Sequence, residues 1–306
     1  MKNYQIERIK QNFKDKDKKT RAKIAQNKEE ARATGTRTSA RSGANPSGAR
    51  TPFKKKKFGQ HFLRKQSVVD HMVDRVVITP ETTVIEIGCG DGFLTSSILE
   101  QSKCKKLLVY EIDVQWLIFI QAKLHDKRLV LNHQNILELD FEKELAPHVP
   151  LVMLANLPYQ ITFPIIFLIQ KHKHLFQEGV VMVQEEVAQK IASKGGRGHS
   201  ATTMFLQYHF TWELMEKVEP AAFEPAPKVS SRLLYFKPKM DIQPITNEEE
   251  FWKFLKLCYK TPRQTLRNNL RPTHYLHEKL SSEVLSLRAQ QVTFEDFIGI
   301  WEKLSE

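Results

Sequence analysis

The stretch VIEIGCGDGFLT, residues 84–95, decides the fold. An apolar strand-like run leads directly into Gly88, Gly90 and Gly92, and a helix-like segment follows. Glycine at such a bend lets the backbone approach a ligand closely. A dinucleotide fingerprint would place its third glycine at position 93, where this chain has Phe93. The GxGxG spacing therefore favours S-adenosylmethionine over NAD, and a plain tight turn is the alternative.

Strand-like and helix-like segments alternate around this bend. The apolar runs cover residues 84–87, 107–112, 128–131, 151–156 and 179–184. Nearly continuous apolar strands separated by helices predict an α/β fold, with a Rossmann-like parallel sheet covered by helices on both faces. Two later runs, 209–218 and 232–238, are expected to add antiparallel strands. Beyond Pro244 the pattern becomes helical.

The charge is distributed very unevenly along the chain. Residues 1–57 hold 18 Lys and Arg against 5 Asp and Glu, whereas the rest of the chain sums to about −1. We predict three parts: a basic disordered tail (1–57), a cofactor-binding domain (58–240) and a small helical domain (241–306). The tail is expected to contact phosphate without sequence preference, and a solvated extension is the alternative.

Composition narrows the class of protein. No apolar run approaches the roughly 20 residues of a membrane span, and the Lys-rich N-terminus lacks a signal sequence. The three cysteines show no CxxC pairing, so we expect neither a disulfide framework nor a metal site. We expect a cytoplasmic monomer without a membrane partner. KKKK at 54–57 leaves a nuclear protein as the alternative compartment.

Polar residues near the predicted strand ends are candidates for cofactor binding. Glu111 lies 23 residues after Gly88, a spacing that suits an acceptor for ribose hydroxyls. Asp113 is expected to cap the next helix, and Glu86 to support the bend structurally. Asn135 is our candidate for the adenine amine of the cofactor, with an ordinary loop asparagine as the alternative.

The tetrapeptide NLPY, residues 156–159, follows the fourth strand, where open sheets bind their ligands. The amino nitrogen of adenine is a poor nucleophile, because its lone pair is delocalised into the ring. The Asn156 side-chain carbonyl and the Leu157 backbone carbonyl, kept free by Pro158, can accept the two amine hydrogens. Tyr159 can stack on the base near a sulfonium cation. An ordinary Asn-x-Pro turn is the alternative.

With these residues, the sequence resembles the KsgA family of small-subunit ribosomal RNA adenine N6-dimethyltransferases, which is related to the erythromycin-resistance methylases. The resemblance covers residues 58–306 and rests on FGQHFL, IEIGCGDG, YEID, NLPYQIT, VQEEVAQKIA, AFEPAPKVSS and TPRQTLRNNL. It implies a class I methyltransferase sheet and S-adenosylmethionine as cofactor. It also implies that Gln60, His61 and Leu63 close over the cofactor and that Phe223 forms a second aromatic wall for the adenine.

This resemblance implies a substrate. Family members methylate two neighbouring adenosines twice each, in the 3′-terminal hairpin loop of small-subunit rRNA, as naked RNA or in an immature small ribosomal subunit. The family usually has Asn in place of His61 and Asp in place of Asn135, and both replacements remain polar. The alternatives are a non-catalytic RNA-binding or ribosome-assembly factor, an erythromycin-resistance-type 23S rRNA methylase and a DNA adenine methylase.

Cationic residues near the C-terminus are candidates for RNA contacts. They recur every three or four residues at Lys253, Lys256, Lys260, Arg263, Arg267 and Arg271. Thr261 and Pro262 predict the start of a new helix, which would break this stripe. We select Lys260, Arg263 and Arg267, and leave a solvated face as the alternative for the first half. Arg197, in the glycine-rich loop 194–199, is a further candidate for phosphate.

Overall fold

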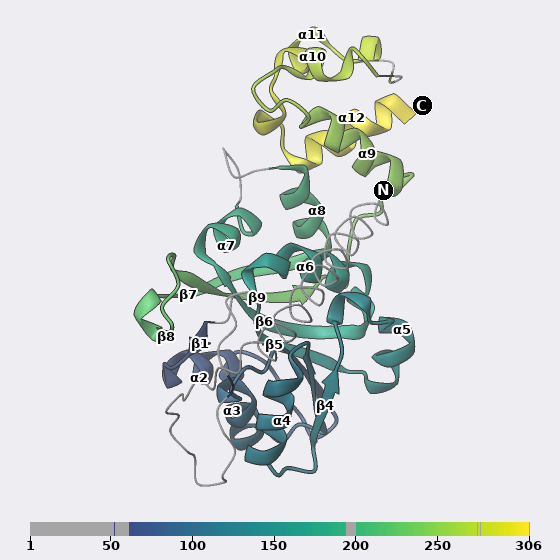
Figure 1. The fold of residues 1–306 in the computed structure, drawn as a ribbon. Helices are drawn as coiled ribbons and strands as arrows, with labels where there is room; N and C mark the ends of the chain where they lie inside the picture. The colour runs from purple at the N-terminus through teal and green to yellow at the C-terminus, as the bar shows by residue number, and fades with distance from the viewer. Residues whose placement is uncertain (1–51, 53–60, 194–199, 274, 276, 306) are drawn as a thin grey trace, which may run out of the picture. The chain divides into compact units, whose positions relative to one another are not determined.

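The computed structural model describes residues 52, 61–193, 200–273, 275 and 277–305 (Figure 1). The chain divides into two compact units. The first comprises the chain up to Phe176 together with Ala221–Pro227, and the second comprises Gln177–Pro220 and Lys228–Glu306. Gln60, Arg197 and the basic tail lie outside the described residues.

Four parallel strands form the sheet of the first unit, in the order β4-β3-β2-β5. They are β2 (Thr83–Ile87), β3 (Lys106–Glu111), β4 (Leu129–His133) and β5 (Leu151–Asn156). The side chains of β2 are buried along its whole length, as the near-continuous apolar run predicts. Ile85 pairs with Leu108 on one side and with Met153 on the other. Four of the five predicted parallel strands are confirmed, and the fifth run, 179–184, forms a strand of the second unit.

Three helices connect these strands: α3 (Phe93–Gln101), α4 (Val114–Lys123) and α5 (Phe141–Glu144). Helix α2 (Gln66–Asp74) precedes β2, and α6 (Thr162–Lys171) follows β5. The chain builds β2, β3 and β4 outward in one direction and then returns to β5 beside β2. Because such crossovers are right-handed, this reversal places α3 and α4 on one face and the β4–β5 connection on the other. Ligands bind at the carboxyl ends of the strands at such a reversal.

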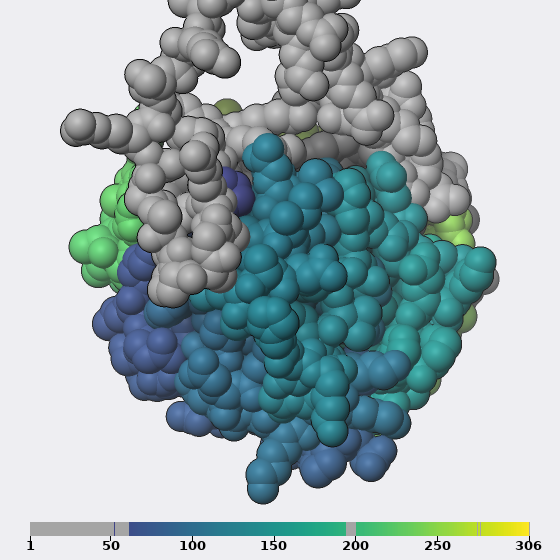
Figure 2. Space-filling view, turned by 60° about the horizontal axis from the view of Figure 1, so that its bottom comes forward, coloured from purple at the N-terminus to yellow at the C-terminus, as the bar shows by residue number. Residues whose placement is uncertain are grey.

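A separate two-stranded antiparallel pair joins distant parts of the first unit. It consists of β1 (Phe62–Leu63) and β8 (Phe223–Glu224). The backbone N–H of Arg64 extends the pair by donating to the carbonyl of Ala222 at 2.8 Å. Figure 2 looks onto the first unit, whose visible surface is built largely from the blue and teal segments of the chain.

The second unit contains three antiparallel strands in the order β6-β9-β7. They are β6 (Phe176–Gln184), β9 (Ser231–Pro238) and β7 (Phe210–Val218), with a register shift between Leu214 and Lys217. This confirms the antiparallel strands predicted from the two later apolar runs. The unit also holds α7 (Glu185–Ile191) and α8 (Ala201–His209).

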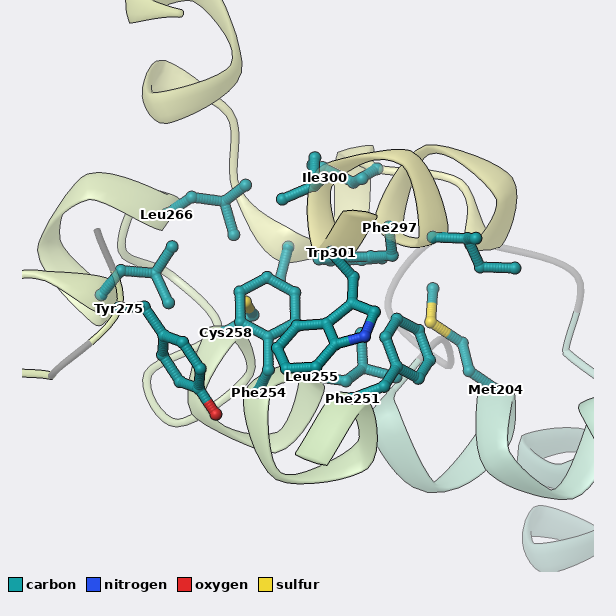
Figure 3. Packing of buried hydrophobic residues seen from close by; sticks show 14 of the residues in the cluster. Met204, Phe251, Phe254, Leu255, Cys258, Leu266, Tyr275, Phe297, Ile300 and Trp301 are labelled. Atoms are coloured by element: carbon teal, nitrogen blue, oxygen red, sulfur yellow. The ribbon is translucent and has the colours of Figure 1, made fainter. Parts of the chain in front are cut away.

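Four further helices of the second unit share an aromatic core: α9 (Glu248–Cys258), α10 (Leu266–Leu270), α11 (Ser282–Ser286) and α12 (Phe294–Ser305). Phe251, Phe254 and Trp301 lie at the centre of this cluster, as Figure 3 shows. The indole N–H of Trp301 donates to the Thr246 carbonyl at 2.7 Å, which satisfies its polar atom. Met204 of α8 belongs to the same cluster.

The prediction of a helix starting at Thr261 is wrong. Helix α9 ends at Cys258 and α10 begins only at Leu266, so residues 261–264 form bends and turns, and Thr265 forms a β-bridge with Arg288. The buried side chain of Asn269 hydrogen-bonds to both the N–H and the C=O of Thr261, at 3.1 Å each. These bonds hold Thr261 in a turn rather than at a helix N-cap. None of the helices in the described ranges is long and apolar enough to cross a membrane.

Candidate active site

The glycine-rich bend lies between β2 and α3. Gly88 and Gly90 have φ values of +77° and +51°, in the left-handed region that glycine tolerates best. A Cβ atom on Gly90 would lie 2.6 Å from Cε1 of Phe62, so a larger residue would clash there. A Cβ atom on Gly88 would have no described atom within 4 Å. The bend therefore offers bare backbone to an open space at Gly88.

Glu111 ends β3 beside this bend and is 6% exposed. Its Oε1 accepts a hydrogen bond from the backbone N–H of Asp113 at 2.8 Å, and the Cys89 thiol lies 3.9 Å from its Oε2. Burial raises the pKa of Glu111, while hydrogen bonds from the N–H groups of Asp113, Gly90 and Ile112 oppose the rise. Glu111 is thus an oriented acceptor next to the bend, as ribose hydroxyls require.

Two neighbouring acidic residues have structural roles. Asp113 caps α4, because its side chain accepts from the N–H of Gln115 at 3.2 Å, as predicted. Glu86, in β2, is 1% exposed, and burial raises its pKa to about 8, with the charge of Glu111 adding to the rise. Its Oε2 has no hydrogen-bond partner among the described residues. Glu86 is therefore mainly protonated at neutral pH.

The tetrapeptide from Asn156 to Tyr159 lies at the carboxyl end of β5. The Nδ2 of Asn156 donates to the backbone carbonyl of His61 at 3.2 Å. This bond fixes the amide so that its Oδ1 faces away from that carbonyl. The Pro158 carbonyl accepts from the N–H of Ile161 at 3.0 Å. The two acceptors that the amine chemistry needs, the Asn156 Oδ1 and the Leu157 carbonyl, therefore lie in consecutive residues at the end of β5.

The β1–β8 pair brings two more segments to the tetrapeptide. Its register places Leu63 opposite Phe223, and both side chains are buried. The Nδ1–H of His61 donates to the carbonyl of Pro225 at 2.8 Å. The same imidazole stacks on Tyr159, with ring centroids 6.1 Å apart and planes 24° apart. Three segments that are far apart in the sequence therefore meet here.

The described residues fit an adenosyl sulfonium compound. The bend at Gly88 leaves room above bare backbone, and Glu111 places a buried acceptor beside it. The unpartnered Oε2 of Glu86 provides a further polar atom under the bend. The described part of the chain contains no group of three His, Cys, Asp or Glu that could hold a metal ion.

Asn135 is engaged in local hydrogen bonds. It caps a short 3₁₀ turn, Ile136–Glu138, by accepting from the N–H of Leu137 at 3.1 Å. Its Nδ2 donates to Glu138 Oε1 at 3.2 Å. The second lone pair of its Oδ1 remains for a ligand amine, so its cofactor role stays a prediction.

The described candidates for RNA contacts belong to the second unit. Lys260, Arg263 and Arg267 are all exposed. Lys260 lies just beyond α9, Arg263 lies in the turn, and Arg267 lies in the first turn of α10. Their proposed contacts stay a prediction.

The structure adds two residues that the sequence analysis did not identify. Arg64 forms an ion pair with Asp91 of the glycine bend, with Nη2 and Oδ2 2.6 Å apart. The ring of Phe62 packs against Gly90 and Trp116. The sequence contains little indication of either, because both contacts join segments that only folding brings together.

Comparisons with known proteins show the family to which this chain belongs. The family model described as ribosomal RNA adenine dimethylase matches residues 53–304. A ribosomal RNA small subunit methyltransferase A from Prosthecochloris aestuarii is 35% identical over 253 residues, which cover 82% of this chain and 94% of the relative. The protein of the same name from Mycoplasma mobile is 33% identical over 236 residues, 76% of this chain and 89% of the relative.

Two solved structures share the mixed α/β fold. A dimethyladenosine transferase from Plasmodium falciparum has a TM-score of 0.66 and 23% identity, covering 79% of this chain and 98% of that one. The 23S rRNA methyltransferase ErmE has a TM-score of 0.65 and 20% identity, covering 80% and 100%. These likenesses show the fold, whereas the family model spans most of the chain. On that basis, the chain belongs to the ribosomal RNA adenine dimethylase family.

Proposed function

We propose that this protein dimethylates N6 of neighbouring adenosines in the 3′-terminal hairpin loop of small-subunit rRNA. As a member of its family, the chain is an rRNA adenine dimethyltransferase that uses S-adenosylmethionine. The named relatives are small subunit methyltransferases, which supports the choice of RNA. The observation that carries the proposal is the Asn156 amide, which is held by the His61 carbonyl while its own oxygen is uncommitted.

The proposed mechanism relies on positioning. The Asn156 Oδ1 and the Leu157 carbonyl accept the two amine hydrogens and so favour a tetrahedral nitrogen with an available lone pair. S-adenosylmethionine, when bound, supplies a methyl group on a sulfonium sulphur that leaves as a neutral thioether. After transfer of that methyl group, the nitrogen held by Asn156 and Leu157 would lose its extra proton to water. The chain therefore needs no dedicated general base.

Aromatic side chains complete the proposed target pocket. Tyr159 provides a face for the adenine and Phe223 a second wall, which suits a base turned out of a single-stranded loop. His61 supports the pocket through its contacts with Asn156 and Tyr159. Gln60, Leu63, Gly88, Gly90, Glu111 and Asn135 form the proposed cofactor site.

The proposed RNA surface is separate from this pocket in sequence. Lys260, Arg263, Arg267 and Arg197 would contact phosphates, and the basic tail would add affinity that depends strongly on salt. This proposal retains the three-part organisation, with a tail (1–57), a methyltransferase domain (58–240) and a helical domain (241–306). The excess of positive charge in the tail supports its role.

Methyl transfer to defined substrates tests the function. Purified protein would be incubated with labelled S-adenosylmethionine and with immature small subunits, naked small-subunit rRNA, 23S rRNA or duplex DNA. We expect label only in small-subunit RNA, mapped to neighbouring adenosines in the terminal hairpin. Label in 23S rRNA would instead support an erythromycin-resistance-type activity. RNA binding without transfer would support an assembly factor.

We also propose that the protein acts in the cytoplasm as a monomer. The proposal rests on its class of substrate. Light scattering at working concentration would test the monomer. A fluorescent fusion, compared with a variant in which Lys54–Lys57 are replaced by Ala, would test whether the KKKK stretch instead directs it to a nucleus.

A further inference from the structure

Arg64 contacts two acidic residues from different segments of the first unit. Its Nη2 lies 2.6 Å from Oδ2 of Asp91, and its Nε lies 3.5 Å from Oε2 of Glu224. Its Nη1 donates to the carbonyl of Leu63 at 3.0 Å. One planar guanidinium thus joins β1, the glycine bend and β8. A lysine could not form this set of contacts, because its single ammonium lacks the fork geometry.

Each acidic partner lies next to a residue of the proposed site. Asp91 stands between the glycines of the bend, and its backbone carbonyl also accepts from Lys123 Nζ at 3.1 Å. Glu224 directly follows Phe223, the proposed wall for the target adenine. The guanidinium therefore connects the loop that would hold the cofactor with the strand that would hold the base.

The side chain of Arg64 contacts the glycine bend, which its backbone does not. The backbone N–H of Arg64 already bonds to β8 through Ala222, whatever the side chain is. Only the side chain reaches the glycine bend. The Arg64 side chain is 36% exposed and that of Asp91 21%, so solvent weakens this pair less than a fully exposed one.

We propose that Arg64 is a positioning residue that couples cofactor binding to binding of the target adenosine. This inference rests on the proposed function, because the second ligand is the RNA. A ligand that orders one end of the Arg64 contacts lowers the entropic cost of ordering the other end. Such coupling is reciprocal, so RNA tightens cofactor binding by the same factor by which cofactor tightens RNA binding.

The coupling factor is measured directly. S-adenosylhomocysteine binding would be followed by calorimetry with and without a small-subunit rRNA fragment that contains the terminal hairpin. We expect RNA to tighten binding about three- to tenfold in the wild type, a small coupling factor because the ion pairs of Arg64 are partly exposed. R64Q should reduce this factor to about one, and R64K should restore only part of it.

Variants of Asp91 and Glu224 test the two ion pairs of Arg64 one at a time. D91N and E224Q should each abolish most of the coupling, and the double variant R64Q/D91N should lose no more than R64Q. The kcat measured with both substrates saturating should change less than about threefold, because Arg64 touches no reacting atom. The KM values for RNA and cofactor should rise instead.

A matched arginine serves as control. Arg128 pairs with Asp126 at 2.7 Å in the same unit and donates to the carbonyls of Ser102 and Leu99. R128Q should lower thermal stability but leave the coupling factor unchanged. If R64Q is too unstable to assay, R64K and E224Q carry the test.

The experiment distinguishes failure of the inference about Arg64 from failure of the proposed function. If the wild type transfers methyl groups to the RNA and R64Q, or R64K and E224Q, keep the full coupling factor, Arg64 is not the coupling residue. The inference also fails if the wild type itself shows no coupling. If the wild type transfers no methyl group to the RNA, the proposed function fails first, and D91N and R64Q should then still weaken binding of the cofactor analogue alone.

Discussion

The amide of Asn156 is fixed at one end and uncommitted at the other. Its Nδ2 donates to the His61 carbonyl, so the residue can orient an acceptor without a further partner in the described chain. Replacing Asn156 by Ala removes this acceptor. We expect the kcat for methyl transfer to fall by about two to three orders of magnitude, because preorganised polar groups commonly contribute that much.

Cofactor affinity in the same variant should change less than about threefold, since the amide is proposed to serve the target amine. Transfer assays and calorimetry with S-adenosylhomocysteine separate the two effects. Asn132→Ala is a matched control, because the Asn132 amide also donates to a backbone carbonyl, that of Val109 at 3.3 Å. Normal turnover in the Asn156 variant would remove its proposed role.

The close packing of Phe62 against Gly90 can be tested by adding a single methyl group at Gly90. The Cβ of Gly90→Ala would lie 2.6 Å from the Phe62 ring, at a φ of +51° that alanine disfavours. We expect a loss of about 1–3 kcal/mol in the free energy of unfolding, the range for overpacked and strained positions. Adding Phe62→Leu should restore part of it in urea unfolding. No recovery in the double variant would show that backbone strain alone is responsible.

The raised pKa of Glu86 predicts that the free energy of unfolding depends on pH. Its pKa rises from about 4.5 in the unfolded chain to about 8 in the folded protein, so the folded state binds the extra proton between these values. Its stabilising contribution is complete below pH 4.5 and is lost as the pH rises through 8. The free energy of unfolding therefore falls across this window, because unfolding releases the extra proton.

Urea unfolding of the wild type and of Glu86→Gln across pH 5 to 9 measures this contribution. The difference in unfolding free energy between the two should fall with rising pH and level off above about pH 8. Glu138→Gln, at an exposed position, is the control and should follow the wild type. A difference that stays constant with pH would show that Glu86 titrates normally.

At the scale of elements, one side chain determines how α9 connects to α10. The Nδ2 of Asn269 donates to the carbonyls of Cys258 and Thr261, at 2.9 and 3.1 Å, and its Oδ1 accepts from the N–H of Thr261. Asn269 is 3% exposed, so these backbone groups have little access to water. They would lose their partners if the amide were removed.

We therefore expect Asn269→Ala to lower the free energy of unfolding by about 2–3 kcal/mol, the cost of leaving buried polar groups unpaired. Hydrogen exchange should locate the loosening at residues 258–270. Asn268→Ala, at an exposed position on the same helix, is the matched control. Equal stability of the two variants would contradict the proposed importance of the amide.

At the scale of the whole molecule, the positive charge is concentrated in residues 1–57. Deleting residues 1–50 should weaken RNA binding most at low salt and make the dependence of log Kd on log salt shallower, by about 0.7 to 0.9 for each phosphate that the tail neutralises. The mid-point of urea unfolding should not change. Filter binding from 50 to 300 mM salt measures the slope, and an unchanged slope would exclude a role in binding phosphate.

Much of the fold could be predicted from local pattern. Apolar runs placed the parallel strands, and β5 coincides with the predicted residues 151–156. Asp113 was correctly predicted as a helix cap, because capping depends on neighbours in the chain. The prediction of a helix at Thr261 is wrong, since the side chain of Asn269, beyond the range of helix capping, satisfies its backbone groups.

The sequence alone determined the family, the glycine bend and the tetrapeptide, because these depend on residue types at short spacings. Only the tertiary structure decided which residues surround them. The bond from Asn156 to His61, the pairing of Leu63 with Phe223 and the ion pairs of Arg64 all join segments that lie far apart in the chain. Such contacts arise when strand pairing closes long loops, and no local pattern of residues encodes which side chains will then meet.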